Sequence, residues 1–145
     1  MDKKKNLSRE DSVIVIALHR IVAEMDRQTR LICKKYDLTL GQFSVLEALH
    51  SKGELSIGEL KNLVLSTDGT IPVVIGNLEK MGFVIKNQDK ADKRKFMVRL
   101  TEAGEELICK VYPENVEMIT KKLSVLSAED KTMSVELLKK YRAHI

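Results

Sequence analysis

The chain has 145 residues, of which 43% are hydrophobic and 32% are charged, with a formal net charge of +4. This length suits one compact unit with one core, so we expect residues 1–145 to form a single domain. The charge is too evenly balanced for a disordered basic tail, so its placement must indicate the partner.

The amino terminus carries positive charge but lacks the long apolar run of a secretory signal or a membrane span. The nearest apolar stretch, residues 13–18, is too short for either role. The two cysteines, Cys33 and Cys109, are far apart and lack C-x-x-C spacing, which argues against a disulfide framework or a zinc ribbon. We therefore expect a cytoplasmic protein in a reducing compartment, with no membrane partner.

Helix starts are marked by a Ser or Thr that is followed three residues later by an acid or an amide, the pattern of a capping box. Such pairs are Ser8 with Asp11, Thr39 with Gln42, Ser56 with Glu59 and Ser127 with Asp130, and Thr101 is a weaker start. Apolar residues of helical period follow each start. They predict helices over residues 10–36, 40–51, 57–64, 102–122 and 128–142.

A different pattern lies between residues 64 and 101. Turn residues precede a helical apolar pattern over 70–81, which Gly82 ends, so a short helix, a turn and a second helix are predicted. Alternating residues over 83–88 and 96–101 predict two strands joined by a charged turn. The predicted fold class is mainly α with a small β-hairpin wing (α+β), a winged helix-turn-helix.

In this arrangement the second helix enters the DNA major groove and the hairpin contacts the flanking backbone. The candidate DNA-binding residues face outward on that helix, precede it, or lie in the hairpin tip: Thr67, Asp68, Thr70, Val73, Asn77, Lys80, Lys90, Lys93, Arg94 and Lys95. Asp89 and Asp92 are expected to cap the turn and to hold Arg94 in one geometry. The alternative for the tip is a solvated charged turn without a DNA-binding role.

The segment Asn77-Leu-Glu-Lys-Met-Gly-Phe-Val84, with Asp89-x-x-Asp92-x-Arg94 and Val98-x-Leu-Thr-x-x-Gly104 after it, resembles the MarR family of transcriptional regulators. The match extends over nearly the whole chain. The resemblance implies a homodimer with one DNA-binding lobe per chain over 38–101, a near-palindromic operator in double-stranded DNA, and an Arg94 that reaches into the minor groove. It also implies repression that a small-molecule effector relieves.

One departure from the family pattern lies early in the second helix. Many members carry a polar pair there, whereas this chain has Pro72 and Val73, which donate no side-chain hydrogen bond to a base edge. Val73 suits a thymine methyl group, and DNA shape is then expected to supply much of the specificity. The same apolar pair keeps a second function open, a protein–protein anti-activator module with weak DNA affinity.

The helices at both ends are more apolar than one small lobe requires. The first carries Val13, Ile14, Ile16, Leu18, Ile21, Val22 and Met25, and the last two carry Leu107, Ile108, Val111, Met118, Ile119, Leu123, Leu137 and Leu138. We therefore predict dimerisation helices over residues 8–36 and 102–145. An intramolecular bundle in a monomer is the alternative.

Cys33 raises a third alternative, an oxidation-sensing repressor, in which Lys34 and Lys35 favour the thiolate. A lone helical cysteine is more often a packing residue, and packing is the role expected for Cys109.

The histidines and the remaining motifs give no sign of catalysis. His19, His50 and His144 lack the spacing of a metal site, and a site assembled with Glu24 or Cys33 is not expected. The chain has no nucleophile elbow, phosphate loop or dinucleotide-binding turn. We therefore expect no metal, no cofactor and no enzymatic activity.

Overall fold

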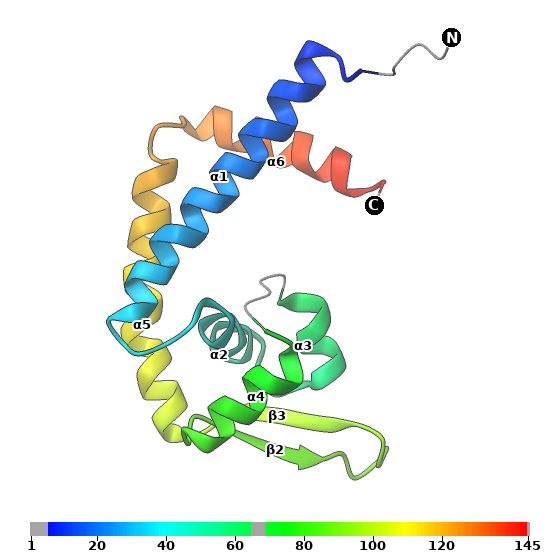
Figure 1. Cartoon of the computed structure of the whole chain (residues 1–145), viewed down its shortest axis with the longest axis vertical. Coiled ribbons are helices and arrows are strands. Elements are labelled where there is room, and N and C mark those ends of the chain that lie inside the picture. The colour runs from blue at the N-terminus through cyan, green and yellow to red at the C-terminus, as the bar shows by residue number, and fades with distance from the viewer. Residues whose placement is uncertain (1–5, 65–68, 145) are drawn as a thin grey trace.

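The computed structural model describes residues 6–64 and 69–144, and within them it contains six helices and one three-stranded antiparallel sheet (Figure 1). The helices are α1 (Arg9–Lys34), α2 (Leu40–Lys52), α3 (Ile57–Leu63), α4 (Ile71–Lys80), α5 (Glu102–Leu123) and α6 (Ala128–Arg142). The strands are β1 (Leu55–Ser56), β2 (Val84–Gln88) and β3 (Phe96–Leu100). The predicted fold class and every predicted helix are confirmed.

Side-chain caps explain why the helices begin where they do. At Thr39 the hydroxyl accepts from the backbone N–H of Gln42 at 3.1 Å, and the Gln42 side chain accepts from the backbone N–H of Thr39 at 3.0 Å. The same two-way bonding occurs at Ser56 and Ser127. Ser8 accepts from the backbone three residues later, but the return bond of the predicted box is absent from the described residues. Each cap satisfies N–H groups that the first helical turn leaves without partners.

The sheet has the order β1-β3-β2. Strands β2 and β3 pair from Val84 opposite Leu100 to Gln88 opposite Phe96, which confirms the predicted hairpin. The sequence did not predict β1, in which Leu55 pairs with Val98. Two residues are too few to show an alternating pattern, so this strand is defined by its partner rather than by its own sequence.

The core lies in the lobe that α2 crosses, and it draws side chains from both ends of the chain. The largest fully buried side chains are Phe43, Leu46, Leu60, Ile75, Leu78, Ile108, Val45, Val84, Val98, Val111 and Cys33. Ile108 and Val111 are 0% exposed, because the first turns of α5 pack against α2. Their assignment to the dimer interface is therefore wrong, since one chain already covers them.

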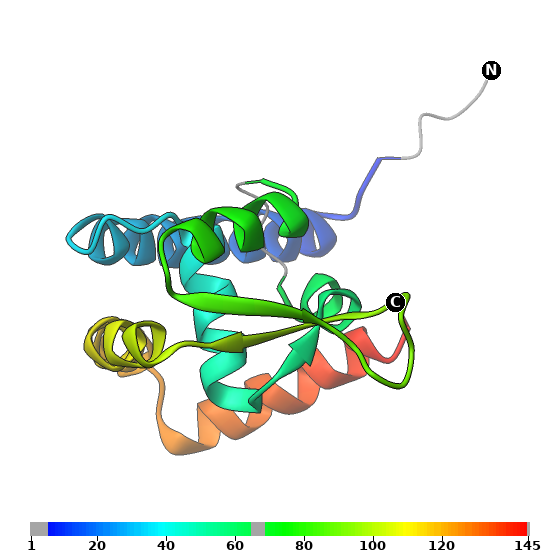
Figure 2. The ribbon, with the colours of Figure 1, turned by 90° about the horizontal axis from the view of Figure 1, so that it is seen from below.

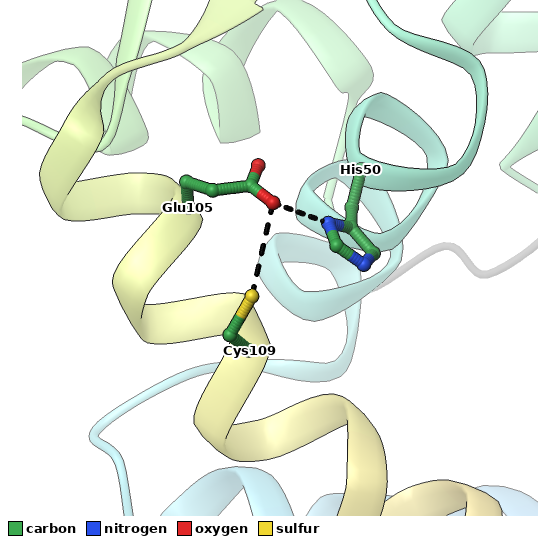
Figure 3. A group of neighbouring side chains, drawn as sticks. All are labelled: His50, Glu105 and Cys109. Atoms are coloured by element: carbon green, nitrogen blue, oxygen red, sulfur yellow. Dashed lines mark hydrogen bonds and ion pairs between the residues drawn. The ribbon is translucent and has the colours of Figure 1, made fainter.

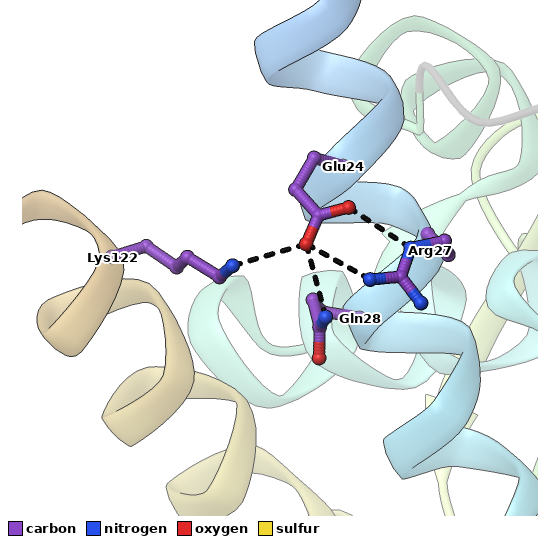
Figure 4. Close-up of polar contacts among 4 residues, drawn as sticks. All are labelled: Glu24, Arg27, Gln28 and Lys122. Atoms are coloured by element: carbon purple, nitrogen blue, oxygen red, sulfur yellow. Dashed lines mark hydrogen bonds and ion pairs between the residues drawn. The ribbon is translucent and has the colours of Figure 1, made fainter.

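Helices α1 and α5 lie side by side and run in opposite directions (Figure 1). Glu24 pairs with Lys122 at 3.0 Å and Thr29 with Asn115 at 2.8 Å, and Lys35, just after α1, pairs with Glu114 of α5 at 2.6 Å. Glu24 also accepts from Arg27 and Gln28 on its own helix (Figure 4). Because Thr29 and Asn115 are buried, their hydrogen bond fixes one register between the two helices.

The amino-terminal half of α1 and the whole of α6 extend away from the lobe (Figure 1), and Figure 2 views the molecule from the end at which the lobe lies. None of the described residues of α6 is buried, and Val13, Ile14, Val15 and Ile16 on α1 are all exposed. The two ends of the chain therefore present apolar surface that the lobe does not cover. Within the described residues, no helix has both the length and the apolar character that crossing a membrane requires.

Candidate nucleic-acid interface

Helix α4 presents an apolar face to the lobe and a mixed face to solvent. Its buried side chains are Ile71, Val74, Ile75 and Leu78. The predicted outward positions Thr70, Val73, Asn77 and Lys80 are all exposed, and Val73 is 58% exposed. Four side chains of different chemistry therefore lie on one accessible side of a helix that fits the major groove.

The two ends of α4 are set by backbone chemistry. Pro72 lies in the first turn, where its missing N–H costs no helical hydrogen bond, and Thr70 is the N-cap residue. Gly82 adopts a positive φ of 81°, and the Phe83 N–H donates to the Leu78 carbonyl at 3.0 Å. This glycine turn ends the helix and directs the chain straight into β2.

Helix α2 supports α4 from inside the lobe. The Gln42 side-chain amide lies 3.8 Å from the Met81 sulfur, and Val74 packs close to Gly41. Helix α4 also packs against α3 and β2. The outward face of α4 is therefore held in place by packing against α2, α3 and β2, which is what a DNA-recognition helix requires.

The tip of the hairpin is an ordered turn rather than a loose loop. The Asp89 N–H donates to the Lys95 carbonyl at 2.8 Å, and the Lys95 N–H donates to the Asp92 carbonyl at 2.9 Å. The Asp89 carboxylate accepts from the backbone N–H of Ala91 at 3.0 Å. Asp92 accepts from both the backbone and the side chain of Arg94. The predicted local role of the two acids is confirmed.

The cations of the tip remain accessible. The Arg94 side chain is 90% exposed although it is paired with Asp92, and Lys90, Lys93 and Lys95 are exposed as well. The Arg94 hydrogen bonds are the main reason why the pKa of the Asp92 carboxyl lies below its usual value. Asp92 therefore stays ionised beside Arg94 and orients its guanidinium without removing it from solvent.

The structure adds Lys86, a cation that the sequence pattern did not assign to this surface. The Lys86 ammonium on β2 lies 5.3 Å from the centre of the Phe96 ring on β3, at the base of the tip. Lys86 is four residues from the nearest lysine of the tip, so only the pairing of the strands shows that it belongs to the same surface. Two other predicted residues, Thr67 and Asp68, lie outside the described residues.

The two cysteines lie in contrasting environments. Cys33 is 0% exposed, and burial raises the pKa of its thiol to about 11, so Lys34 and Lys35 do not stabilise a thiolate there. A buried thiol with a raised pKa reacts poorly with oxidants, which argues against the oxidation-sensing alternative. Cys109, which was expected to pack, is exposed.

Comparison with known proteins places this surface in context. The family model for the transcriptional regulators SarA/Rot matches residues 27–111, which include α2, α3, α4 and the whole sheet. Among curated proteins, the HTH-type transcriptional regulator YkoM of Bacillus subtilis (strain 168) is 32% identical over 111 residues, covering 77% of this chain and 72% of YkoM.

Two solved structures share the fold. A mutant MarR from E. coli, complexed with operator DNA, superposes with a TM-score of 0.78 at 23% identity, covering 94% of this chain and 99% of that one. NadR in complex with 4-hydroxyphenylacetate superposes with a TM-score of 0.77 at 23% identity, covering 97% of each chain. Other proteins with this architecture thus bind operator DNA or a small ligand.

Proposed function

Because the chain belongs to the SarA/Rot family of transcriptional regulators, within the MarR-like winged-helix proteins, we propose that it represses transcription as a homodimer bound to a near-palindromic operator. The observation that carries this proposal is the pairing of two features in one lobe, the exposed face of α4 and the ordered cationic tip of the β2–β3 hairpin. The first suits base edges in the major groove and the second suits phosphates or the minor groove.

The four outward residues named above, on α4 and at its N-cap, have chemically matched roles. Asn77 suits bidentate hydrogen bonding to adenine, Thr70 suits a phosphate or base edge near the helix start, and Val73 suits a thymine methyl group. Lys80, at the far end, suits a phosphate. Because only two of these residues hydrogen-bond to base edges, much of the specificity comes from DNA shape, which Arg94 reads in a narrow minor groove.

The apolar surface of α1 supports the homodimer. Residues 13 to 16 are consecutive and all exposed, at 59%, 56%, 45% and 50%, so together they cover a complete turn of the helix. A helical turn that is apolar on every side is normally covered on every side, and the lobe of the same chain leaves this turn exposed. A second copy, contributing its own α1, α5 and α6, supplies the missing cover by two-fold symmetry.

A groove of about 490 Å³ between α1 and the lobe is our candidate for the effector site. Its lining includes Asp26 of α1 and Ser44, Glu47 and Ser51 of α2. The carboxylate and hydroxyl oxygens of these side chains suit a small molecule with hydrogen-bond donor groups. A ligand wedged here would change the angle between the lobe and the dimer helices, and so the distance between the two copies of α4.

The test is a fluorescence anisotropy titration of DNA from upstream of the chain's own gene, run at two salt concentrations with a scrambled duplex as control. A DNA-binding repressor must bind the upstream DNA more tightly, with log affinity falling linearly against log salt by about 0.9 for each phosphate neutralised. Equal and weak binding to both duplexes would favour the anti-activator alternative, in which the exposed Val73 contacts a protein.

A further inference from the structure

Three side chains with metal-binding atoms converge where α2 meets α5 (Figure 3). His50 lies in the last turn of α2, and Glu105 and Cys109 are one helical turn apart near the start of α5. The Glu105 carboxylate oxygen lies 2.7 Å from Nδ1 of His50 and 3.7 Å from Sγ of Cys109. All three ligand atoms lie within 4.8 Å of one another.

The three ligand types are those that zinc prefers, since Zn²⁺ binds imidazole nitrogen, thiolate sulfur and carboxylate oxygen in a tetrahedron. With bonds of about 2.0–2.3 Å, neighbouring ligand atoms in such a tetrahedron are about 3.3–3.8 Å apart. The Glu105–Cys109 separation of 3.7 Å lies in that range and the Glu105–His50 separation of 2.7 Å is shorter than it, so side-chain rotations that move Glu105 and His50 slightly apart make room for the ion. We propose that His50, Glu105 and Cys109 bind a Zn²⁺ ion between α2 and α5.

The surroundings of the cluster suit an accessible site with one open position. Glu105 and Cys109 are exposed and the His50 side chain is 29% exposed, so a water molecule has room to serve as the fourth ligand. The Tyr112 ring packs against the His50 ring, with centroids 5.8 Å apart and planes at 57°. Tyr112 is three residues after Cys109 on α5, so the helix that supplies two ligands also orients the third.

Without metal, Glu105 holds the cluster together by hydrogen bonds to both neighbours. Metal binds the thiolate form of cysteine, so a Zn²⁺ ion bound here would displace the Cys109 proton to solvent.

The site does not depend on the proposed DNA-binding function. Its ligands lie on the α5 side of α2, whereas the α4-supporting contact of Gln42 with Met81 lies at the opposite end of that helix. An ion here joins α2 of the lobe to α5, the helix that leaves the lobe toward α6. Binding of the metal ion is measured without DNA, so failure of the metal site and failure of the proposed DNA-binding function can be told apart.

The test is a Co²⁺ titration of the metal-free chain, followed by optical absorption. Tetrahedral Co²⁺ with a thiolate ligand gives visible d–d bands and a near-ultraviolet sulfur-to-cobalt charge-transfer band, and we expect one equivalent per chain. Cys109→Ser is expected to abolish the charge-transfer band, and His50→Gln and Glu105→Gln to weaken affinity at least tenfold. Cys33→Ala, which removes the buried thiol, is the matched control and should leave the spectrum unchanged.

A second readout uses the exposure of Cys109. In the Cys33→Ala variant the remaining thiol, Cys109, should react readily with an alkylating reagent. The alkylation rate should fall at least tenfold when one equivalent of Zn²⁺ is added, and should return to its original value when a chelator is added. The proposal is overturned if wild type shows no thiolate band and no protection by Zn²⁺. It is equally overturned if Cys109→Ser and Glu105→Gln bind the metal as wild type does.

Discussion

In the hairpin tip, Nε of Arg94 donates to the carboxylate of Asp92 at 3.1 Å, two residues earlier in the chain. The second guanidinium nitrogen reaches the other oxygen of the same carboxylate at 3.3 Å. Arg94 is thus oriented before it meets a partner, while 90% of its side chain remains in solvent. A residue oriented in advance loses less conformational entropy on binding than a free one.

The first prediction concerns this pair. Arg94→Ala should weaken binding to the upstream DNA by about 5- to 150-fold, the equivalent of about 1–3 kcal/mol, and should reduce the salt slope by about 1. Asp92→Ala should weaken binding less, because the cation remains but its orientation is lost. Fluorescence anisotropy at two salt concentrations measures both effects.

Two controls separate orientation from charge. Arg94→Lys keeps the charge but not the planar fork and should give an intermediate affinity. Lys110→Ala removes one positive charge from an exposed position on α5 and should leave affinity nearly unchanged. If Arg94→Ala bound operator DNA as well as wild type, the assignment of the wing to DNA binding would be wrong.

Local chemistry in the sequence was sufficient to predict most of the fold. Thr39, Ser56 and Ser127 each marked a helix start that the structure confirms, because a capping box is complete within four residues. Strand β1 was not predicted, because its two residues form a strand only through their pairing with β3. Short-range patterns carry the information for helices, and long-range pairing carries the information for such a strand.

The same distinction separates the predicted from the unpredicted site residues. Arg94 and Asp92 are two positions apart, so their relationship was predictable from the sequence. His50 and Cys109 are separated by more than fifty residues and become neighbours only when α2 packs against α5. Their exposure or burial likewise depends on packing, which is why Cys109 was expected to be buried and is not.

The second prediction concerns the homodimer. Ile16 on α1 is 50% exposed and Leu138 on α6 is 52% exposed in one chain, and both are covered in the proposed dimer. Ile16→Glu and Leu138→Glu therefore each place a charge in the proposed interface. Each should shift the chain from dimer to monomer, because burying an unpaired carboxylate is strongly unfavourable. Sedimentation equilibrium or light scattering over a concentration series measures the shift.

The matched control is Val73→Glu, the same kind of change at a 58% exposed residue of α4. It should leave the chain dimeric while weakening DNA binding. A wild-type chain that is monomeric at every concentration would contradict the homodimer and favour the intramolecular bundle.

The third prediction concerns the junction between the wing and α5. A Cβ added at Gly104 would lie 2.1 Å from the Phe83 carbonyl oxygen, which also accepts the Thr101 N–H at 3.0 Å. Gly104→Ala must therefore displace either the start of α5 or the backbone of Phe83, which links α4 to β2. We expect a loss of about 3 kcal/mol in the free energy of unfolding, measured by denaturant titration at fixed chain concentration.

Gly76→Ala provides the control for this substitution. Gly76 lies within α4, and apart from its chain neighbours and the backbone of its own helix, no atom of the described residues is within 4 Å of the added Cβ. Alanine should therefore stabilise the helix by about 0.5–1 kcal/mol. If both substitutions had the same sign, the close approach of Gly104 to Phe83 would not be a constraint on the fold.

The fourth prediction concerns acid stability. Hydrogen bonds from Arg27, then Gln28 and Lys122, lower the pKa of Glu24 from 4.5 to about 2. Because the folded-state pKa is depressed, the stability that Glu24 contributes is fully present above about pH 4.5 and is lost as the pH falls toward 2. Glu24→Gln should therefore lower the Tm at pH 7, and the difference from wild type should shrink steadily below pH 4.5.

High salt should also reduce this difference at pH 7, since all the partners are partly exposed and solvent screens their charges. Lys122→Met should lower the Tm more when it is introduced into wild type than when it is introduced into the Glu24→Gln variant. The reason is that the ion pair between Glu24 and Lys122 is already missing in that variant. Glu117→Gln, at an exposed carboxylate on α5, is the control. A Tm difference for Glu24→Gln that stayed constant from pH 7 to pH 3 would show that Glu24 acts by shape rather than by charge.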